Sequence, residues 1–98
     1  MNLRFRKDRT ATGKLELVAI GECTWDDFPK RAETVVNHFG MDVVNKTDGQ
    51  DERLWITRFG RSKFCVSWDI WFPEVSIIAW EDTPDTAIEQ LAATQLTT

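Results

Sequence analysis

The chain has 98 residues and a formal net charge of −4, with 29% charged and 42% hydrophobic residues. This length suits one hydrophobic core, so we expect a single domain over residues 1–98. The composition is that of a soluble globular protein and excludes a disordered chain. No hydrophobic stretch approaches the roughly 20 residues of a transmembrane helix, and the N-terminus lacks the features of a secretory signal. We therefore expect a cytoplasmic protein with no membrane partner.

Charge is unevenly distributed along the chain. Residues 1–49 hold eight basic and eight acidic residues, whereas the segment from Asp69 to the end holds six acidic residues and no basic one. The six are Asp69, Glu74, Glu81, Asp82, Asp85 and Glu89. A negative surface repels phosphate, so we do not expect nucleic acid as a partner. The one basic cluster, at residues 4–9, alternates with apolar residues and is typical of a solvated strand edge.

The first half of the chain predicts two strands and a helix. Residues 3–6 and 14–20 alternate apolar and polar side chains, as half-exposed strands do. Apolar side chains then recur at helical spacing, with a proline in the first turn and Gly40 just after the last. We expect this helix over residues 26–39, capped by one of the aspartates at its start.

The second half predicts four strands and a second helix. The strands are expected at residues 41–46, 53–59, 63–70 and 74–80, and the turns between them at residues 47–50, 60–62 and around Pro73. Such short connections favour antiparallel neighbours, because a parallel pairing needs a long crossover. Thr83 and Pro84 indicate the start of a C-terminal helix, whose apolar stripe is Ile88, Leu91, Ala92 and Leu96. The order ββαββββα predicts an α+β fold, an antiparallel sheet of five to six strands with two helices packed on one face.

Four of the five tryptophans lie between Trp55 and Trp80, together with three phenylalanines. Because strand residues alternate between two faces, these rings can be sorted. The face expected to pack against the helices includes Leu54, Ile56, Phe64, Val66, Trp68 and Ile70. The opposite face includes Trp55, Thr57, Trp71, Ile78 and Trp80. The tryptophan cluster is therefore predicted to divide between the core and a second face.

Three tryptophans on the second face would form a large apolar surface, because each contributes roughly 150–250 Å². A typical monomer's largest apolar patch is only about 300–600 Å². We therefore expect Trp55, Thr57, Trp71, Ile78 and Trp80 to bind a protein partner or a second copy of the chain, as in a homodimer. The alternative is that the rings are purely structural. A bulge or Pro73 can shift the register by one residue, and aromatic pairs can stabilise a half-exposed sheet.

Residues that support catalysis are few and scattered. His38 is the only histidine, and neither Cys23 nor Cys65 lies at a spacing that predicts a nucleophile–base pair or a zinc site. Acidic residues precede both helices, where capping is favoured over a hydrolase pair or a hard-cation site. We predict no catalytic residue, no metal site and no cofactor. An enzyme that uses the acidic clusters is the weaker hypothesis.

Two non-enzymatic functions stay open. The first is a binding or self-associating module that uses the tryptophan face. The second is an acidic inhibitor of the immunity type, whose six acidic residues from Asp69 onwards mask the positive cleft of a toxin or nuclease. The salt dependence of partner capture separates these hypotheses, because only the acidic inhibitor would lose its partner at high salt.

Two segments carry a resemblance to a known family. By its size, and by WDDFPKRAETVVNHFG together with FCVSWDIWFPEVSIIAW, the chain resembles small bacterial proteins classed only as a domain of unknown function. The resemblance spans most of the chain and implies no activity, cofactor or catalytic residue. The run SWDIWFPEVSI also resembles the tryptophan-rich hairpins of some toxin-immunity proteins, which keeps the inhibitor hypothesis open.

Overall fold

A computed structural model describes residues 3–95 and has the predicted order of elements, ββαββββα. The strands are β1 (Phe5–Arg9), β2 (Leu15–Ala19), β3 (Asp42–Asp48), β4 (Glu52–Phe59), β5 (Ser62–Asp69) and β6 (Val75–Ala79), and the helices are α1 (Phe28–Phe39) and α2 (Thr86–Ala93). The strands form one six-stranded antiparallel sheet in the order β1-β2-β6-β5-β4-β3. The predicted α+β class is confirmed. Neither of these helices is long and apolar enough to cross a membrane.

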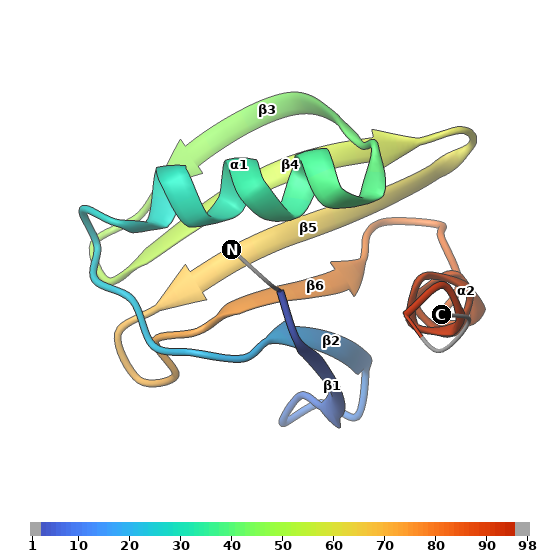
Figure 1. The fold of residues 1–98 in the computed structure, drawn as a ribbon, viewed down its shortest axis with the longest axis horizontal. Coiled ribbons are helices and arrows are strands. Elements are labelled where there is room, and N and C mark those ends of the chain that lie inside the picture. Colours follow the sequence, from blue (N-terminus) through green and yellow to red (C-terminus); the bar gives the residue numbers. More distant parts are fainter. Residues whose placement is uncertain (1–2, 96–98) are drawn as a thin grey trace.

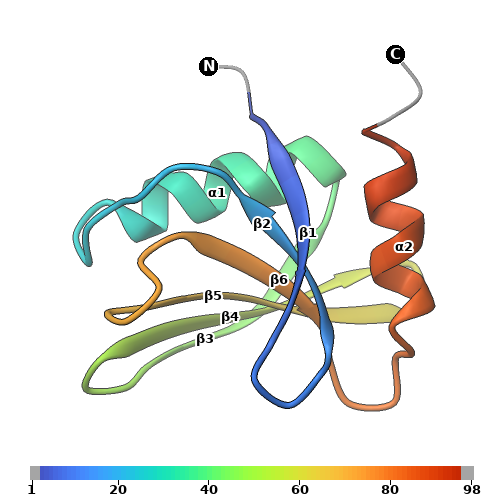
Figure 2. The ribbon, with the colours of Figure 1, turned by 90° about the horizontal axis from the view of Figure 1, so that it is seen from below.

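Both helices pack on the same side of the sheet. Helix α1 runs along the sheet, and α2 stands at one end with its axis across that of α1 (Figures 1 and 2). The sheet twists strongly, so that β1 runs across the direction of β4 and β5 (Figure 2). Buried side chains of both helices and of one sheet face form one hydrophobic cluster. The predicted packing of the two helices on one face is confirmed.

Helix α1 forms where the sequence predicts it. It begins at Phe28 and ends at Phe39, and the φ of 72° at Gly40 is the left-handed conformation that glycine adopts without strain. Its buried residues are Phe28, Ala32, Val35 and Val36, which recur at helical spacing and face the sheet. In α2 the buried residues are Ala87, Ile88, Leu91 and Ala92. Leu96, also predicted for this stripe, lies outside the described residues.

The acidic residues before the helices do not cap them, contrary to expectation. Asp27 and Asp85 occupy the N-cap positions, yet neither side chain makes a capping hydrogen bond. The Asp85 carboxylate instead accepts a hydrogen bond from the backbone N–H of Leu15 at 3.1 Å. The hydroxyl of Thr83 accepts one from the backbone N–H of Lys63 at 2.9 Å, and α2 begins three residues later. Asp85 and Thr83, which lie where a cap of α2 is expected, thus accept hydrogen bonds from strands that are distant in the sequence.

The register between β4 and β5 corrects the predicted face of Trp55. Phe59 pairs with Ser62 across a two-residue turn, and this register places Trp55 opposite Val66. Directly opposed residues of antiparallel strands share a face, and Val66 belongs to the core. Trp55 therefore lies under the helices and is only 4% exposed. The prediction took residues 60–62 as the turn, and an error of one residue moves a whole strand to the other face.

The same register reassigns the rest of β4. Thr57, predicted to lie on the surface, is fully buried, and its hydroxyl donates to the sulfur of Met41 at 3.3 Å. Leu54 and Ile56, predicted in the core, lie on the face turned away from the helices, which we call the helix-free face. Its central residues are Glu16, Val18, Leu54, Ile56, Cys65, Ser67, Ser76 and Ile78.

Aromatic contacts attach α1 and the segment before it to the sheet. The rings of Phe28 and Trp55 pack edge to face with their centroids 5.6 Å apart. Those of Trp25 and Trp68 do the same with their centroids 6.0 Å apart. The indole N–H of Trp68 also donates to a backbone carbonyl of the β2–α1 connection at 2.9 Å. The Arg53 guanidinium lies 4.8 Å from the centre of the Trp25 ring and donates to the carbonyl of that residue. Burial and directional bonds together hold this part of the core.

Candidate functional site

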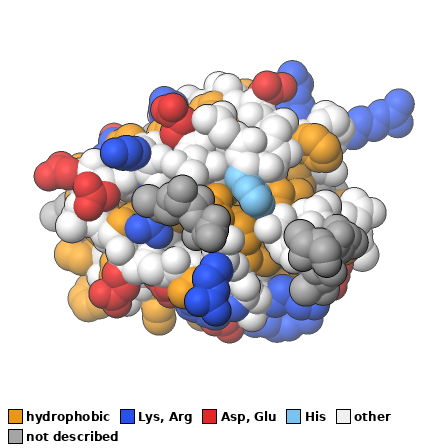
Figure 3. Space-filling model, in the orientation of Figure 1, with side chains coloured by type: hydrophobic (Ala, Val, Ile, Leu, Met, Phe, Trp, Pro, Cys, Tyr) orange, Lys and Arg blue, Asp and Glu red, His pale blue; other side chains and the backbone are white. Residues whose placement is uncertain are grey.

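The most exposed aromatic side chains lie together between β5 and β6, at residues 70–74, which we call the aromatic loop. Trp71 and Phe72 are each 78% exposed, and Ile70 before them is 55% exposed. The other four tryptophans are buried or half-buried. Hydrophobic side chains gather at the lower left of Figure 3, where this loop lies in Figure 1. Three consecutive large apolar residues in water are typical of a contact surface.

Hydrogen bonds hold the backbone of the aromatic loop. The carboxylate of Asp69 accepts hydrogen bonds from the backbone N–H groups of Trp71 and Phe72, both at 2.8 Å. The carbonyl of Pro73 accepts one from the backbone N–H of Cys23, also at 2.8 Å. The two rings are thus presented on a backbone that is already in place. A partner that binds them has little loop entropy to overcome.

Glu74 ties the end of the aromatic loop to β1 and to the connection that follows β2. Its Oε1 accepts from the Arg6 guanidinium at 2.8 Å, and its Oε2 accepts from the Gly21 backbone N–H at 2.7 Å. The hydrogen bond from Arg6, then that from Gly21, lowers the pKa of Glu74 below its ordinary value. The same bond from Glu74 raises the pKa of Arg6. The loop is therefore anchored to β1 and to the residues that follow β2.

A groove of about 550 Å³ lies beside the aromatic loop. Side chains of the helix-free face line it, among them Glu16, Val18, Ser67, Ser76 and Ile78. The β1–β2 hairpin and Phe72 of the aromatic loop also contribute to the lining. The groove and the exposed rings thus form one continuous surface. Its volume is in the range of sites that hold a small ligand or one long side chain.

Carboxylates outnumber guanidiniums at the Arg6 side of the groove. Arg6 lies 2.8 Å from Glu74 and 3.8 Å from Asp8, and Glu16 is close enough to raise the pKa of Arg6 as well. The hydroxyl of Ser76 donates to the carboxylate of Glu16 at 2.7 Å. Two guanidiniums, those of Arg6 and Arg31, therefore lie near three carboxylates. This part of the groove favours a cation over an anion.

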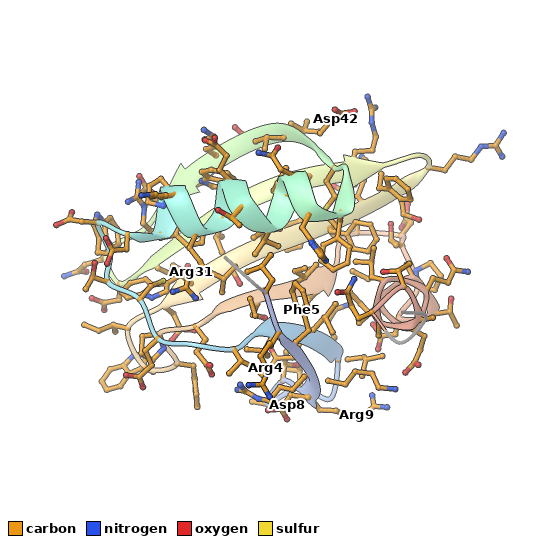
Figure 4. All side chains as sticks on the ribbon, in the orientation of Figure 1. Arg4, Phe5, Asp8, Arg9, Arg31 and Asp42 are labelled. Carbon is orange, nitrogen blue, oxygen red and sulfur yellow. The ribbon has the colours of Figure 1, made fainter. Side chains whose placement is uncertain are left out.

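The remaining basic side chain of the groove is directed elsewhere. Arg9 donates from its Nη1 to the carbonyl of Gly13 at 2.9 Å, within the β1–β2 hairpin. Figure 4 shows Arg9 beside Asp8 on β1, at the opposite edge of the sheet from Asp42 on β3. Arg9 is thus tied to its own hairpin turn, and its backbone N–H donates to the carboxylate of Asp8 at 2.8 Å.

The structure separates the five residues predicted to bind a partner. Trp55 and Thr57 are buried under the helices, so the predicted face of three tryptophans is wrong. Trp71 is exposed as expected, but it lies in the aromatic loop beyond the end of β5. Ile78 lies on the helix-free face and lines the groove. Trp80 follows β6 and is half-buried.

Sequence reasoning missed Phe72 and misplaced Ile70. The prediction continues the strand through residue 70 and assigns Ile70 to the core. The strand instead ends at Asp69, whose carboxylate accepts hydrogen bonds from the next N–H groups and so turns the backbone. An aspartate four residues before a proline was the available signal for this turn.

Four of the six acidic residues from Asp69 onwards form ion pairs with other parts of the chain. The pairs are Arg6–Glu74, Lys63–Glu81, Lys14–Asp85 and Lys7–Glu89, with N–O distances of 2.8, 3.2, 3.8 and 3.2 Å. The carboxylate of Asp69 accepts from the aromatic loop, and Asp82 is exposed. The segment from Asp69 onwards contains no basic residue, but basic side chains from other parts of the fold lie beside it and partly neutralise its surface.

Candidate residues for catalysis or metal binding do not converge within residues 3–95, which contain no metal-ligating cluster. The Nε2 of His38 lies 3.0 Å from the Oε1 of Gln95, and its ring packs against two phenylalanines. Cys65 is 2% exposed, and burial raises the pKa of its thiol to about 11. Burial also raises the pKa of Cys23. Both thiols are protonated at neutral pH, which disfavours a nucleophilic role.

A known family matches most of the chain. The family model described as "Protein of unknown function (DUF3630)" matches residues 5–96, which include every strand and helix given above. The resemblance to a domain of unknown function is thus confirmed. No curated protein and no solved structure matches the chain.

Proposed function

The chain belongs to the family of proteins of unknown function DUF3630, and we propose that it is a non-enzymatic module that binds a protein through the aromatic loop. The observation that carries this proposal is the pair Trp71 and Phe72, each 78% exposed on a backbone held by hydrogen bonds. Tryptophan is enriched among the few residues that carry most of the binding energy of protein interfaces, and phenylalanine is enriched in interfaces as well.

The size of the apolar surface supports this proposal. Two aromatic side chains that are each 78% exposed bury roughly 230–390 Å² when a partner covers them. At about 25 cal/mol per Å², that burial contributes about 6–10 kcal/mol before the costs of association. The fold gains little from these rings, because they stand in water. When a partner covers the two rings, their apolar surface leaves water and contributes favourably to the free energy of binding.

The acidic-inhibitor hypothesis has less support. Glu74, Glu81, Asp85 and Glu89 each meet a basic side chain from another part of the fold. These pairs weaken the negative field that would steer a basic toxin or nuclease to this part of the chain. The aromatic loop, by contrast, has no covering group among residues 3–95.

The test places a photo-crosslinking amino acid, benzoyl-phenylalanine, at position 71 or at position 59 in the cells that make the protein. Phe59 is a matched control, since it is an aromatic residue that is 52% exposed at the far end of β5 from the aromatic loop (Figure 1). We expect a discrete protein adduct at position 71, lost on Phe72→Ala, and no such adduct at position 59. Absence of adducts at position 71, or the same adducts at both positions, would contradict the proposal.

A further inference from the structure

We propose that the groove beside the aromatic loop accepts a lysine or arginine side chain of the partner protein. This inference rests on the proposed function, and it adds the chemistry of the segment that docks there. The groove and the loop share Phe72, so a partner that covers the exposed rings also lies over the groove.

The lining of the groove matches the two parts of a long basic side chain. Lysine and arginine carry an apolar stem that packs on apolar surface and a charged end that stays among polar groups. The half-buried Ile78 supplies apolar surface above the buried Val18, and Ser67 and Ser76 lie next to them with hydroxyl groups. Phe72 adds an aromatic ring, whose face attracts a cation.

The charges around the groove favour a cation. Arg6 lies among Glu74, Asp8 and Glu16, and Arg31 also acts on Glu74. Within residues 3–95 no basic side chain forms an ion pair with Glu16, so the three carboxylates exceed the two guanidiniums by one charge. The carboxylate of Glu16 accepts a hydrogen bond from the neutral hydroxyl of Ser76. An incoming ammonium or guanidinium would offset this excess of negative charge.

The same charges disfavour a second copy of the chain as the occupant. In a two-fold dimer through this surface, residues 69–74 of the second copy would face the groove, and they carry Asp69 and Glu74 and no basic residue. Inserting it into the groove would bring acidic groups next to Glu16 and Asp8, and like charges in an interface are repulsive. A different protein with a basic residue beside an apolar surface fits better.

The test uses two synthetic tripeptides and NMR spectra of the whole, isotope-labelled protein. One tripeptide has lysine between two leucines, and the other is identical except that the lysine ε-amine is acetylated, which removes the charge and keeps the stem. We expect the lysine peptide to shift the backbone signals of Val18, Ser67, Ser76 and Ile78. The acetylated peptide should bind at least fivefold more weakly. Equal binding of the two peptides, or no shifts at the groove, would overturn the inference.

Matched charge variants complete the test. Glu16→Gln and, independently, Asp8→Asn should each weaken binding of the lysine peptide at least threefold, whereas Glu33→Gln on the exposed face of α1 should not change it. The spectrum of each variant shows whether it is folded. Unchanged affinity in folded Glu16→Gln and Asp8→Asn proteins would overturn the inference. A position-71 adduct without selective lysine binding refutes only the groove chemistry, and selective lysine binding without that adduct refutes only the proposed function.

Discussion

The helix-covered face of the sheet and the aromatic loop use the same residue type in opposite ways. Trp55 and Trp68 are 4% and 6% exposed and meet other aromatic rings edge to face, whereas Trp71 and Phe72 stand in water a few residues further along the chain. The difference arises at Asp69, where β5 ends and the backbone turns away from the sheet. Aromatic density along a sequence therefore does not mark the core; the position of each ring relative to the strand ends does.

The largest expected effect is at the helix-covered face. Trp68→Ala and Trp55→Ala should each lower the free energy of unfolding by about 3–5 kcal/mol, because Trp55 leaves a cavity under α1 and Trp68 leaves one under the β2–α1 connection. Urea denaturation followed by far-ultraviolet circular dichroism measures this. A Trp68→Ala protein as stable as the wild type would contradict its place in the core.

A smaller effect is expected where the aromatic loop is anchored. Glu74 has a lowered pKa in the folded protein, so its carboxylate contributes stability above the ordinary carboxyl pKa of about 4. This contribution is lost as the pH falls through the lowered value in the folded state. Glu74→Gln should therefore lower the free energy of unfolding by about 0.5–1 kcal/mol at pH 7, as expected for an exposed ion pair.

Denaturation curves measured across a range of pH values check this expectation for the anchor. The difference between the wild type and Glu74→Gln should shrink as the pH falls below about 4, while Glu33→Gln should show no comparable trend. A Glu74→Gln difference that stays constant with pH would mean that the ionised carboxylate is not what fixes the loop to Arg6.

The smallest effect on stability is expected at the rings of the aromatic loop. Trp71→Ala and Phe72→Ala should each change the free energy of unfolding by less than about 0.5 kcal/mol, because these side chains are mostly exposed. The same urea denaturation as for Trp68→Ala provides the direct comparison. A loss of 2 kcal/mol or more would show that the rings are structural and would remove the basis for the proposed binding surface.

Most elements of the fold could be predicted because their signals are local. Helical spacing of apolar residues and the glycine at position 40 predicted α1, and short turns predicted antiparallel neighbours for β3 to β6. The caps of the helices could not be predicted in this way. Asp85 and Thr83 bind the backbone N–H groups of Leu15 and Lys63, which are distant in the sequence.

The candidate site could be predicted only in part. The exposure of Trp71 and the position of Ile78 on the helix-free face were expected, whereas Trp55 and Thr57 were assigned to the wrong face. The error follows from one turn, because the register of β4 against β5 depends on whether the turn after Phe59 has two residues or three. Phe72 was missed because the strand was extended past Asp69.

The sequence by itself determined the order of the elements, their approximate bounds and the concentration of aromatic residues in the second half of the chain. These follow from periodicity and turn residues, which act over a few neighbouring positions. Only the tertiary structure decided on which face of the sheet each aromatic ring lies and which basic side chain pairs with each acidic one. Strand register and ion pairing join residues far apart in the chain, such as Arg6 and Glu74, so their outcome depends on the whole fold.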